Sequence, residues 1–258
     1  MHCLPFLLLL LILCVKMVCN QIHAISIDKD ILTPFHNNNV ETSTRRKNRL
    51  SHKFYEVFNT KNYNKKNKTD AHYSIHSFAK SHSGKTIFGH KITISDGFKM
   101  LSVLEPKQTG GCNGHLTSTV LDSSKQRECL VAISAGFFNE NTGQCFGNVV
   151  SDGQRVNQFR GLKSANFGIR MDGSVVVGYI KEEDITEMRH SFKQLVTGVG
   201  WVLRNGEDYL KESLEHEQCN LDNLQEYFDA RSARTFLGHD ATGNIKIIQI
   251  EGKTGMQG

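Results

Sequence analysis

Glycine is confined to one part of this chain and divides its 258 residues into two regions. All 22 glycines lie at or after Gly84. Residues 20–70 are instead rich in Asn, Lys, Ser and Thr, a composition that cannot bury enough apolar surface to offset the entropy of ordering the chain. We therefore predict a flexible basic leader over residues 25–84 and a single folded domain over residues 85–258.

The net charge of the chain comes from the same leader. The sequence has 31 Lys and Arg residues against 26 Asp and Glu residues, which gives a net charge of +5. Residues 20–70 contain ten basic and five acidic side chains, so the leader carries the whole excess and the rest of the chain is neutral. A nucleic-acid-binding protein needs a basic patch on its folded part, and the sequence therefore argues against that class.

An apolar run near the N-terminus indicates targeting to the secretory pathway. Leu4–Val15 is almost uninterrupted Leu, Ile and Phe over 12 residues, which is short for a membrane span and typical of a signal-peptide core. We predict a signal peptide over residues 1–24, with an N-terminal membrane anchor as the alternative. The mature chain would then be lumenal or secreted, in an oxidising compartment.

Two short motifs lie in the predicted leader. Arg45–Arg49 contains four basic residues, which mark either a propeptide cleavage site after Arg49 or a solvated basic stretch. Asn67 begins an Asn-Lys-Thr sequon, the acceptor signal for N-glycosylation.

Seven cysteines reduce to four once the predicted signal peptide is removed. The four are Cys112, Cys129, Cys145 and Cys219. An even number of cysteines in a secretory chain predicts disulfides, with three connectivities open. No Cys-x-x-Cys pair occurs, so a thiol-redox site or a Cys-rich zinc site has little support.

From about His72 the residue pattern is that of a β-rich domain. Thr86–Ile94 and Lys99–Leu104 alternate as strands do, and Leu130–Ile133 is a short apolar run. We expect an α+β fold, in which helices flank a mixed, largely antiparallel sheet within a single domain.

Turn and helix signals complete the predicted elements. Asp172-Gly173 and Asp240–Gly243 each separate apolar segments and predict hairpins. The lone Trp201 lies in Gly198–Leu203, which we expect to be a buried strand. Weaker patterns predict helices over Thr117–Lys125, Glu182–Met188 and Leu221–Tyr227.

Four segments combine glycine with amide or charged side chains, as a sugar- or phosphate-binding cleft requires. They are Gly110–Cys112, Ala135–Asn139, Cys145–Gly153 and Ser232–Asp240. Tight turns with capped ends are the alternative explanation. His72 and His76 have the spacing of metal ligands on a helix, but no carboxylate accompanies them, so we predict no metal and no organic cofactor.

These segments resemble the lumenal domain of the phosphodiester glycosidase family, and the resemblance runs from Leu101 to Gly258. The matching blocks, in order, are Leu101–Pro106, Gly110–Cys112, Gly136–Phe138, Thr142–Asp152, Asn166–Arg170, Asp172-Gly173, Gly178-Tyr179, Trp201, Arg204–Gly206, Ser232–Thr235 and Gly238–Asp240. Enzymes of this family remove an α-linked N-acetylglucosamine from the phosphate on a mannose of a lysosomal hydrolase. That reaction exposes mannose 6-phosphate for lysosomal sorting.

The resemblance implies one cleft in which a cation stabilises the departing phosphate and a carboxylate assists the sugar carbon or its attacking water. Arg234 is the predicted cation, because a guanidinium can hold two phosphate oxygens at once. Asp240 is the predicted carboxylate, with Asp152 behind it. His239 is expected to orient water, substrate or Asp240. A surface ion pair is the alternative role for Arg234.

The matching blocks also predict substrate contacts and a disulfide. Asn148 and Thr235 are expected to hydrogen-bond the sugar or phosphate. The remaining predicted substrate-binding residues are Gly136, Phe137, Phe138 and Asn139, with the two phenylalanines supporting the pyranose face. The resemblance predicts that Cys112 pairs with Cys145. It leaves open whether Cys129 pairs with Cys219 or lacks a partner.

The chain departs from the family pattern at Ser134 and at its C-terminus. Ser134 stands where the family has Asn, and a hydroxyl cannot present an amide's donor and acceptor together. The chain ends at Gly258, before the family's Asp-Gly-Gly-Gly-Ser block and its later Cys-rich modules and membrane anchor. We expect a domain that is incomplete at the C-terminus, with an unpaired sheet edge and little or no turnover by this chain alone.

Two functions are predicted. The first is hydrolysis of N-acetylglucosamine from GlcNAc-1-phospho-6-mannose diesters on lysosomal enzymes, in the Golgi lumen. The second is a catalytically silent, secreted glycan- or phosphate-binding protein on the same scaffold. The expected partners are phosphorylated N-glycans of lysosomal hydrolases. A membrane contact is expected only through the C-terminal anchor of a full-length parent.

Overall fold

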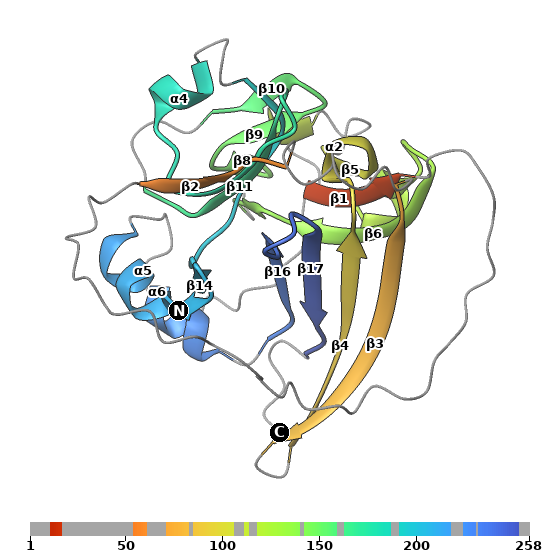
Figure 1. Ribbon diagram of the computed structural model, residues 1–258, viewed down its shortest axis with the longest axis vertical. Coiled ribbons are helices and arrows are strands. Elements are labelled where there is room, and N and C mark those ends of the chain that lie inside the picture. The colour runs from red at the N-terminus through yellow and green to blue at the C-terminus, as the bar shows by residue number, and fades with distance from the viewer. Residues whose placement is uncertain are drawn as a thin grey trace. The chain divides into compact units, whose positions relative to one another are not determined.

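The structure of the chain is a computed structural model (Figure 1). It describes residues 11–16, 54–60, 71–82, 85–105, 111–113, 118–139, 142–158, 163–186, 191–217, 224–230 and 232–252. One compact unit contains residues 1–18 and 54–258, and residues 19–53, a second unit, lie outside the described residues.

The largest sheet has six strands, in the order β10-β9-β13-β11-β12-β2. These strands are β2 (Tyr55–Phe58), β9 (Val149–Ser151), β10 (Gln154–Asn157), β11 (Asn166–Arg170), β12 (Val175–Gly178) and β13 (Phe192–Thr197). Every described pairing in the sheet is antiparallel. Strand β11 is buried at all five positions, so both faces of the sheet are covered at its middle.

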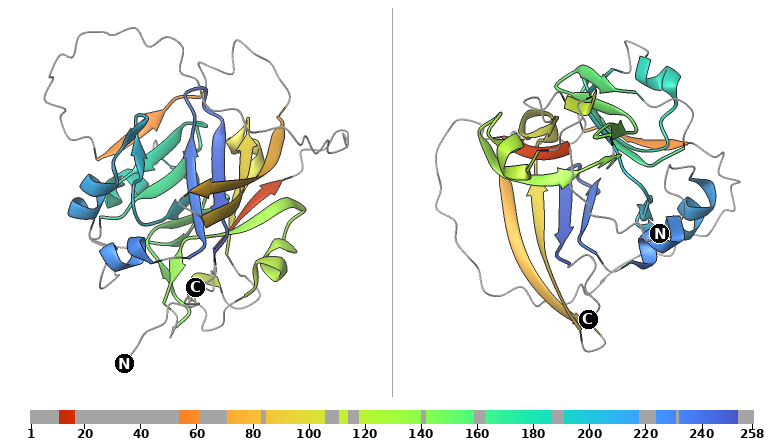
Figure 2. Two further views of the ribbon diagram at one scale, coloured as in Figure 1. Left: turned by 90° about the horizontal axis from the view of Figure 1, so that it is seen from below. Right: turned by 180° about the vertical axis from the view of Figure 1, so that it is seen from behind.

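A second sheet has four antiparallel strands, in the order β16-β17-β4-β3. They are β3 (Tyr73–His82), β4 (Lys85–Ile94), β16 (Arg234–His239) and β17 (Ile245–Ile250). Strands β3 and β4 form a long hairpin. Figure 2 shows β16 and β17 between this hairpin and the six-stranded sheet in both views.

Three smaller sheets complete the described β-structure. One places β1 (Leu11–Lys16) between β5 (Leu101–Leu104) and β6 (Cys129–Ala135). The others are the hairpins of β7 (Phe137–Phe138) with β8 (Cys145–Phe146) and of β14 (Leu203–Arg204) with β15 (Glu207–Asp208).

The helices are short. They are α2 (Gly97–Met100), the 3-10 helix η2 (Gly111–Asn113), α3 (Val120–Ser124), α4 (Glu182–Thr186), α5 (Leu210–His216) and α6 (Leu224–Asp229). Helices α3, α4 and α6 lie within or overlap the three ranges where the sequence predicted helices, whereas α2, η2 and α5 were not predicted. Within the described residues, no helix has the length and apolar character needed to span a bilayer.

Antiparallel sheets with few helices agree with the predicted α+β class, and both predicted hairpins are confirmed. Asp172-Gly173 connects β11 to β12, and Gly173 has φ +86°. Asp240–Gly243 connects β16 to β17, and Gly243 has φ +84°. A left-handed backbone at these positions is the conformation that glycine tolerates best. The strand predicted around Trp201 is wrong, because Trp201 is buried but lies just before β14 without sheet pairing.

The prediction of a flexible leader over residues 25–84 is wrong for two segments. Strand β2 pairs with β12, and strand β3 pairs with β4 along ten residues. Polar composition hid these strands, because β2 lies at the edge of its sheet and β3 exposes many of its side chains. The predicted signal peptide also contains an ordered strand, β1. Its cleavage stays a prediction.

The main hydrophobic core joins the two large sheets. Ile92 and Ile94 of β4 and Ile245 and Ile247 of β17 lie in one buried cluster with Ile169 of β11. Isoleucine fits this position because β-branched side chains pack well on a pleated surface. The core thereby holds β16, the last described strand on one side of the four-stranded sheet, in a fixed position beside the six-stranded sheet.

Candidate active site

The predicted disulfide between Cys112 and Cys145 is confirmed. It joins η2 to β8 across 33 residues, and both cysteines are buried in the main hydrophobic cluster. The bond therefore anchors the β7–β8 hairpin, which carries Phe137 and Phe138, to the core. Cys129 is also disulfide-bonded. Its pairing with Cys219 stays a prediction, because Cys219 lies outside the described residues.

Three polar side chains form a buried cluster where the ends of three neighbouring strands of the six-stranded sheet meet. Asn148 precedes β9, Asn166 begins β11 and Thr197 ends β13. Because β13 runs antiparallel to both β9 and β11, the end of β13 lies beside the start of each of these two strands. Each residue is at most 7% exposed, so the cluster is almost completely removed from water.

Hydrogen bonds join these three residues closely. The Asn148 N–H donates to Thr197 Oγ1 at 2.7 Å, and Thr197 Oγ1 donates to Asn166 Oδ1 at 2.7 Å. The Asn166 amide donates to the carbonyls of Ser164 and Gly178 at 2.7 and 3.2 Å. Buried polar groups need such partners. The network fixes the Asn148 backbone beside the β8–β9 turn.

Phe137, Tyr227 and Phe228 form an aromatic group close in sequence to these strand ends. The rings of Phe137 and Tyr227 are 5.8 Å apart between centroids, and those of Tyr227 and Phe228 are 5.3 Å apart, each pair in edge-to-face geometry. Phe137 is opposite Phe146 in the β7–β8 hairpin, and Phe146 precedes Asn148 by two residues. Phe228 packs directly on Gly200. Helix α6 therefore brings Tyr227 and Phe228 to the hairpin and to the loop after β13.

Arg234 at the start of β16 is held against the end of helix α6. Its guanidinium lies 4.5 Å from the Tyr227 ring centroid. Nη2 donates to the carbonyls of Tyr227 and Ala230 at 2.6 and 2.9 Å, and Nη1 donates to the Ala233 carbonyl at 3.0 Å. A cation at the C-terminus of a helix is favourable because the last carbonyls lack helical partners. These bonds fix the position of a positive charge beside the aromatic group.

A partly buried carboxyl group, that of Glu217, supports the loop against which Phe228 packs. Both Glu217 oxygens accept the Gly200 N–H at 3.1 Å, and Oε1 accepts from Ser213 Oγ at 2.6 Å. Ser213 Oγ also accepts the Trp201 N–H at 2.7 Å. Burial raises the pKa of Glu217, although its hydrogen bonds act in the opposite direction. Glu217 therefore positions the Gly198–Trp201 loop.

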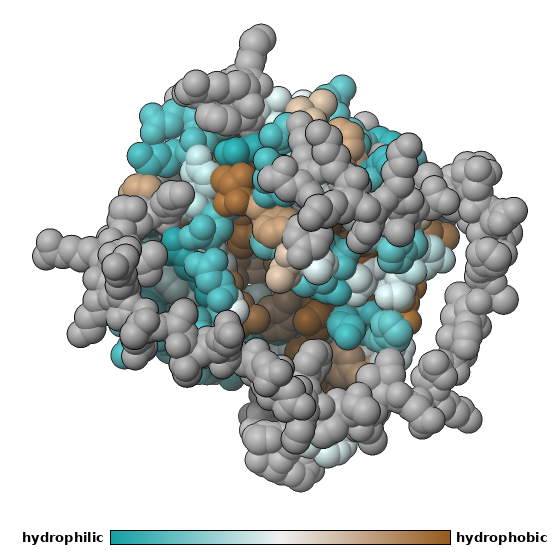
Figure 3. Space-filling model, in the orientation of Figure 1, coloured by the Kyte–Doolittle hydropathy of each residue, from teal (hydrophilic) through white to brown (hydrophobic). Residues whose placement is uncertain are grey.

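We define the candidate site as Phe137, Asn148, Asn166, Thr197, Tyr227 and Arg234. The predicted residues Phe137, Asn148 and Arg234 belong to it, connected through the contacts described above. Tyr227, Asn166 and Thr197 were missed by the sequence analysis. Figure 3 shows apolar residues in the middle of the face over β16 and β17, surrounded by polar ones.

The predicted pair of Arg234 and Asp240 is not brought together. Arg234 begins β16, and Asp240 follows the last residue of this six-residue strand. At about 3.3 Å per residue, their Cα atoms are about 20 Å apart. The prediction that both groups face one cleft is therefore wrong, because an extended strand separates them.

The Asp240 carboxylate organises the β16–β17 turn. It accepts hydrogen bonds from the N–H and Oγ1 of Thr242, from the N–H and Nδ2 of Asn244, and from Lys246 Nζ at 3.0 Å. His239 Nδ1 is hydrogen-bonded to the Asp240 backbone carbonyl at 2.9 Å, and the His239 ring lies against the Phe58 ring, with centroids 4.8 Å apart. Partial burial raises the pKa of Asp240, but the bonds from Thr242, Lys246 and Asn244 outweigh it and hold the pKa below its ordinary value.

We predict that Asp240→Asn lowers stability at neutral pH and has little effect at strongly acidic pH. The pKa of Asp240 is lower in the folded state, so the carboxylate stabilises the fold above the unfolded pKa near 4, and this contribution is lost as pH falls through the folded value. Urea unfolding of both proteins from pH 7 to pH 2 checks this. A stability difference that stays constant with pH would contradict the prediction.

Asp152, the second predicted carboxylate, also serves a turn. It follows β9 with φ +48°, and its carboxylate accepts from Gln194 Nε2 at 2.5 Å, from Ser102 Oγ at 3.3 Å and from Arg127. Asn148 and Asp152 flank the same strand, so the two predicted site residues lie at its opposite ends. Asp152 is held in a network with β5 and β13 rather than beside Arg234.

The other predicted positions lie in local structure around the hairpins. Gly136 has φ +73° and introduces β7, while Asn139 shapes the following loop by accepting the Thr142 N–H at 3.0 Å. Phe138 pairs with Cys145, and Thr235 pairs with Gln249. Asn67 lies outside the described residues. Among those that are described, no group of three or more His, Cys, Asp or Glu residues has the arrangement of a metal site.

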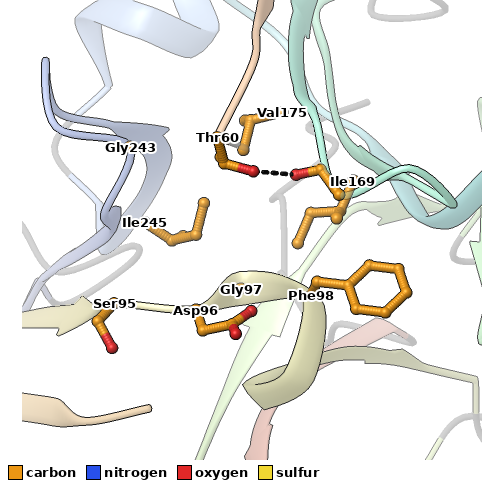
Figure 4. Close-up of a pocket in the computed structure, with 10 residues that line it drawn as sticks. Thr60, Ser95, Asp96, Gly97, Phe98, Ile169, Val175, Gly243 and Ile245 are labelled. Atoms are coloured by element: carbon orange, nitrogen blue, oxygen red, sulfur yellow. Dashed lines mark hydrogen bonds between the residues drawn. The ribbon is translucent and has the colours of Figure 1, made fainter. Parts of the chain in front are cut away.

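A small pocket lies between the start of α2, the β11–β12 turn and β17 (Figure 4). Thr60 Oγ1 donates to the Gly173 carbonyl at 2.8 Å at its wall. The volume that the centre of a water molecule can occupy in this pocket is about 20 Å³, which is enough for a water molecule but not for a hexose. This pocket is therefore not the sugar site.

Comparison with known proteins settles the family. A family model described as "Phosphodiester glycosidase" matches residues 127–258, which is just over half of the chain. The chain belongs to the phosphodiester glycosidase family. The match includes the described candidate site, from Phe137 to Arg234.

Curated relatives carry one name. N-acetylglucosamine-1-phosphodiester alpha-N-acetylglucosaminidase of Mus musculus is 38% identical over 193 residues, which is 72% of this chain and 37% of the relative. The Homo sapiens protein of the same name is 36% identical over 189 residues, which is 72% of this chain and 36% of the relative. The chain thus spans little more than a third of the length of these relatives.

A solved structure shares the fold. It is the catalytic domain of zebrafish N-acetylglucosamine-1-phosphodiester alpha-N-acetylglucosaminidase, auto-inhibited by its propeptide. The TM-score is 0.68 at 34% identity, with 80% of this chain and 68% of that chain covered. The antiparallel architecture described above is therefore similar to that of this zebrafish domain.

The residues that the sequence analysis missed have weak local signals. Asn166 lies in a block that resembles the family, but its side chain is buried in the sheet network and has no motif of its own. Thr197 is a polar residue at the end of an apolar strand. Tyr227 is an aromatic at the end of a predicted helix. Only the folded chain shows that Tyr227 contacts Arg234 and Phe137, and that Asn166 and Thr197 are hydrogen-bonded to Asn148.

Proposed function

We propose that this chain provides the hydrolase domain that removes α-linked N-acetylglucosamine from GlcNAc-1-phospho-6-mannose diesters. Membership of the phosphodiester glycosidase family and the shared name of the curated relatives support this proposal. The product would be mannose 6-phosphate on the glycans of lysosomal enzymes, and the expected setting is the Golgi lumen. The predicted signal peptide agrees with that setting.

The observation that carries the proposal is the fixed guanidinium of Arg234 beside an aromatic group. Cleavage of the bond between the sugar carbon and the phosphate oxygen transfers negative charge to the phosphate. A phosphomonoester has a second pKa of about 6, so it departs near neutral pH without full protonation. A preorganised cation at the departing oxygens is then the main requirement. A guanidinium has five N–H groups, enough to hold the α6 carbonyls and still reach a phosphate.

The rest of the candidate site suits an N-acetylated sugar. The rings of Phe137 and Tyr227 offer apolar surface for a pyranose face. Asn148 would bond the sugar hydroxyl or acetamido groups through the small part of the residue that is exposed, and the Thr197–Asn166 network holds its backbone. Binding would position the sugar carbon for attack by water, with its phosphate toward Arg234.

Two substrates test the proposed function in the whole protein that contains this chain. One is a diester of N-acetylglucosamine 1-phosphate with methyl mannoside, and the other is an α-N-acetylglucosaminide without phosphate. We expect release of N-acetylglucosamine and of mannose 6-phosphate from the diester, and far slower release from the phosphate-free glycoside. Equal rates on both would contradict a phosphate-dependent mechanism.

A silent glycan- or phosphate-binding protein is the second candidate function. The engagement of both predicted carboxylates, Asp152 and Asp240, in structural turns favours it. Calorimetry with the diester distinguishes the two. Binding of the intact diester without release of N-acetylglucosamine would support the binding protein, whereas turnover supports the hydrolase.

A further inference from the structure

Strands β5 and β6 do not pair with each other, and β1 lies between them. The register of β1 is antiparallel to both neighbours, with Cys14 opposite Ser102 of β5 and Ala132 of β6. A sheet of this kind has a space for one strand at its centre, and that space is filled here by an N-terminal segment.

The side of β5 that faces this space is buried. The Val103 N–H donates to Gln194 Oε1 at 2.8 Å, and the Val103 carbonyl accepts from Ser151 Oγ at 2.7 Å. Because backbone groups alternate in direction along a strand, those of Ser102 and Leu104 point toward β1. These two residues are 0% and 3% exposed. Strand β1 supplies both the hydrogen-bond partners and this burial, so without a strand in the space these backbone groups would lose their partners and the apolar surface around them would face water, which is unfavourable.

The walls of the space require an apolar occupant on both faces. Position 13 is opposite Val103 and Ile133, which both belong to the main hydrophobic cluster. Position 12 is opposite Leu104, which packs with Val120 and Ala132 beside helix α3. The sequence Leu-Ile-Leu-Cys-Val of residues 11–15 meets this requirement.

The same residues form the core of the predicted signal peptide. A signal peptide that is removed before the domain folds is not available as the central strand of this sheet. We infer that β5 and β6 form a strand-acceptor slot that binds an extended apolar peptide antiparallel to both, and that the slot accepts such a strand in trans once the N-terminal segment is removed. Main-chain bonds supply the affinity and apolar side chains the selectivity, as in other cases of strand addition.

Cleavage of the folded chain tests the slot directly. A protease recognition sequence is inserted after Arg49 in the full chain, and Cys3, Cys14 and Cys19 are replaced by alanine so that no disulfide holds the N-terminal fragment. After cleavage we expect the fragment of residues 1–49 to co-elute with the rest of the chain in gel filtration. Immediate separation of the fragment, with no change in the melting temperature of the remainder, would overturn the inference.

Competition then tests acceptance in trans. A synthetic peptide of residues 9–17 should displace the bound fragment from the cleaved chain. The melting temperature of the cleaved chain should stay the same after this exchange. The matched peptide with Leu13→Pro should not displace the fragment, because proline lacks the N–H that faces β6 and is not tolerated in a central strand. Equal displacement by both peptides would contradict a strand-pairing slot.

A cross-link tests the register without relying on a destabilised variant. The Cys14 backbone groups face β5, so Cys14 and Ala132 form a non-hydrogen-bonded pair, with Cα atoms about 4.5 Å apart, which is within the range of a disulfide. In the otherwise unaltered chain, Ala132→Cys should form a disulfide to Cys14 on mild oxidation. The control Val131→Cys, one residue along β6, should not. Peptide mapping that finds the same yield in both would overturn the proposed register.

Discussion

Replacing Gly147 by alanine should lower the free energy of unfolding by about 3 kcal/mol, which corresponds to a fall of about 6–12 °C in melting temperature. Gly147 has φ +75°, where a Cβ is strained, and an added Cβ would lie within 3 Å of the Thr197 side chain. The substitution would therefore also push Thr197 away from Asn148 and Asn166 and disturb the candidate site.

Gly206→Ala is the matched control for this prediction. Gly206 also has a left-handed backbone, with φ +81°, but an added Cβ would meet nothing within 4 Å. Only the backbone strain remains, so a loss of about 1 kcal/mol is expected. Thermal unfolding followed by circular dichroism measures both variants. Equal losses would show that close packing against Thr197 is not what makes Gly147 necessary.

Replacing Arg234 by methionine in the whole protein should lower kcat/KM for the phosphodiester by about 10²–10³-fold, the usual effect of removing a preorganised charge-stabilising donor. Arg234→Lys should recover part of the activity, because it keeps the charge but loses the planar fork. Steady-state kinetics with the diester substrate measure both. Inhibition by inorganic phosphate should weaken in parallel.

Stability measurements separate this role from the support that Arg234 gives to helix α6. The guanidinium bonds three backbone carbonyls, so Arg234→Met should also lose stability, by about 1–3 kcal/mol. Arg155→Met, which removes an exposed guanidinium bonded to Gln158, should leave kcat/KM and stability unchanged. A folded Arg234→Met protein with normal kcat/KM and normal phosphate inhibition would exclude Arg234 from the reaction.

Local patterns in the sequence predicted most of the elements that surround the site. The turns at Gly173 and Gly243 follow from Asp-Gly and Thr-Gly between apolar arms, because such residues adopt the turn backbone wherever they occur. The pairing of Cys112 with Cys145 followed from resemblance to the family. These features depend on short stretches of chain or on whole blocks of similar sequence, and both can be read without a structure.

The positions of side chains relative to one another could not be predicted from these local patterns. Arg234 and Asp240 are close in sequence, but a strand advances about 3.3 Å per residue, more than twice the rise of a helix. Nearby residues in one motif were therefore placed at opposite ends of β16. Asn148 and Asp152 lie at opposite ends of β9 for the same reason, because an extended strand separates them.

The sequence by itself determined the family, the antiparallel class, the two hairpins and the disulfide. Tertiary structure alone decided that the N-terminal segment lies in a sheet and that β2 and β3 are ordered. It also decided that Tyr227 contacts Arg234 and that Asn166 and Thr197 are hydrogen-bonded to Asn148. The physical reason is that strand pairing and burial join residues far apart in the chain, whereas turns and covalent spacing act between neighbours.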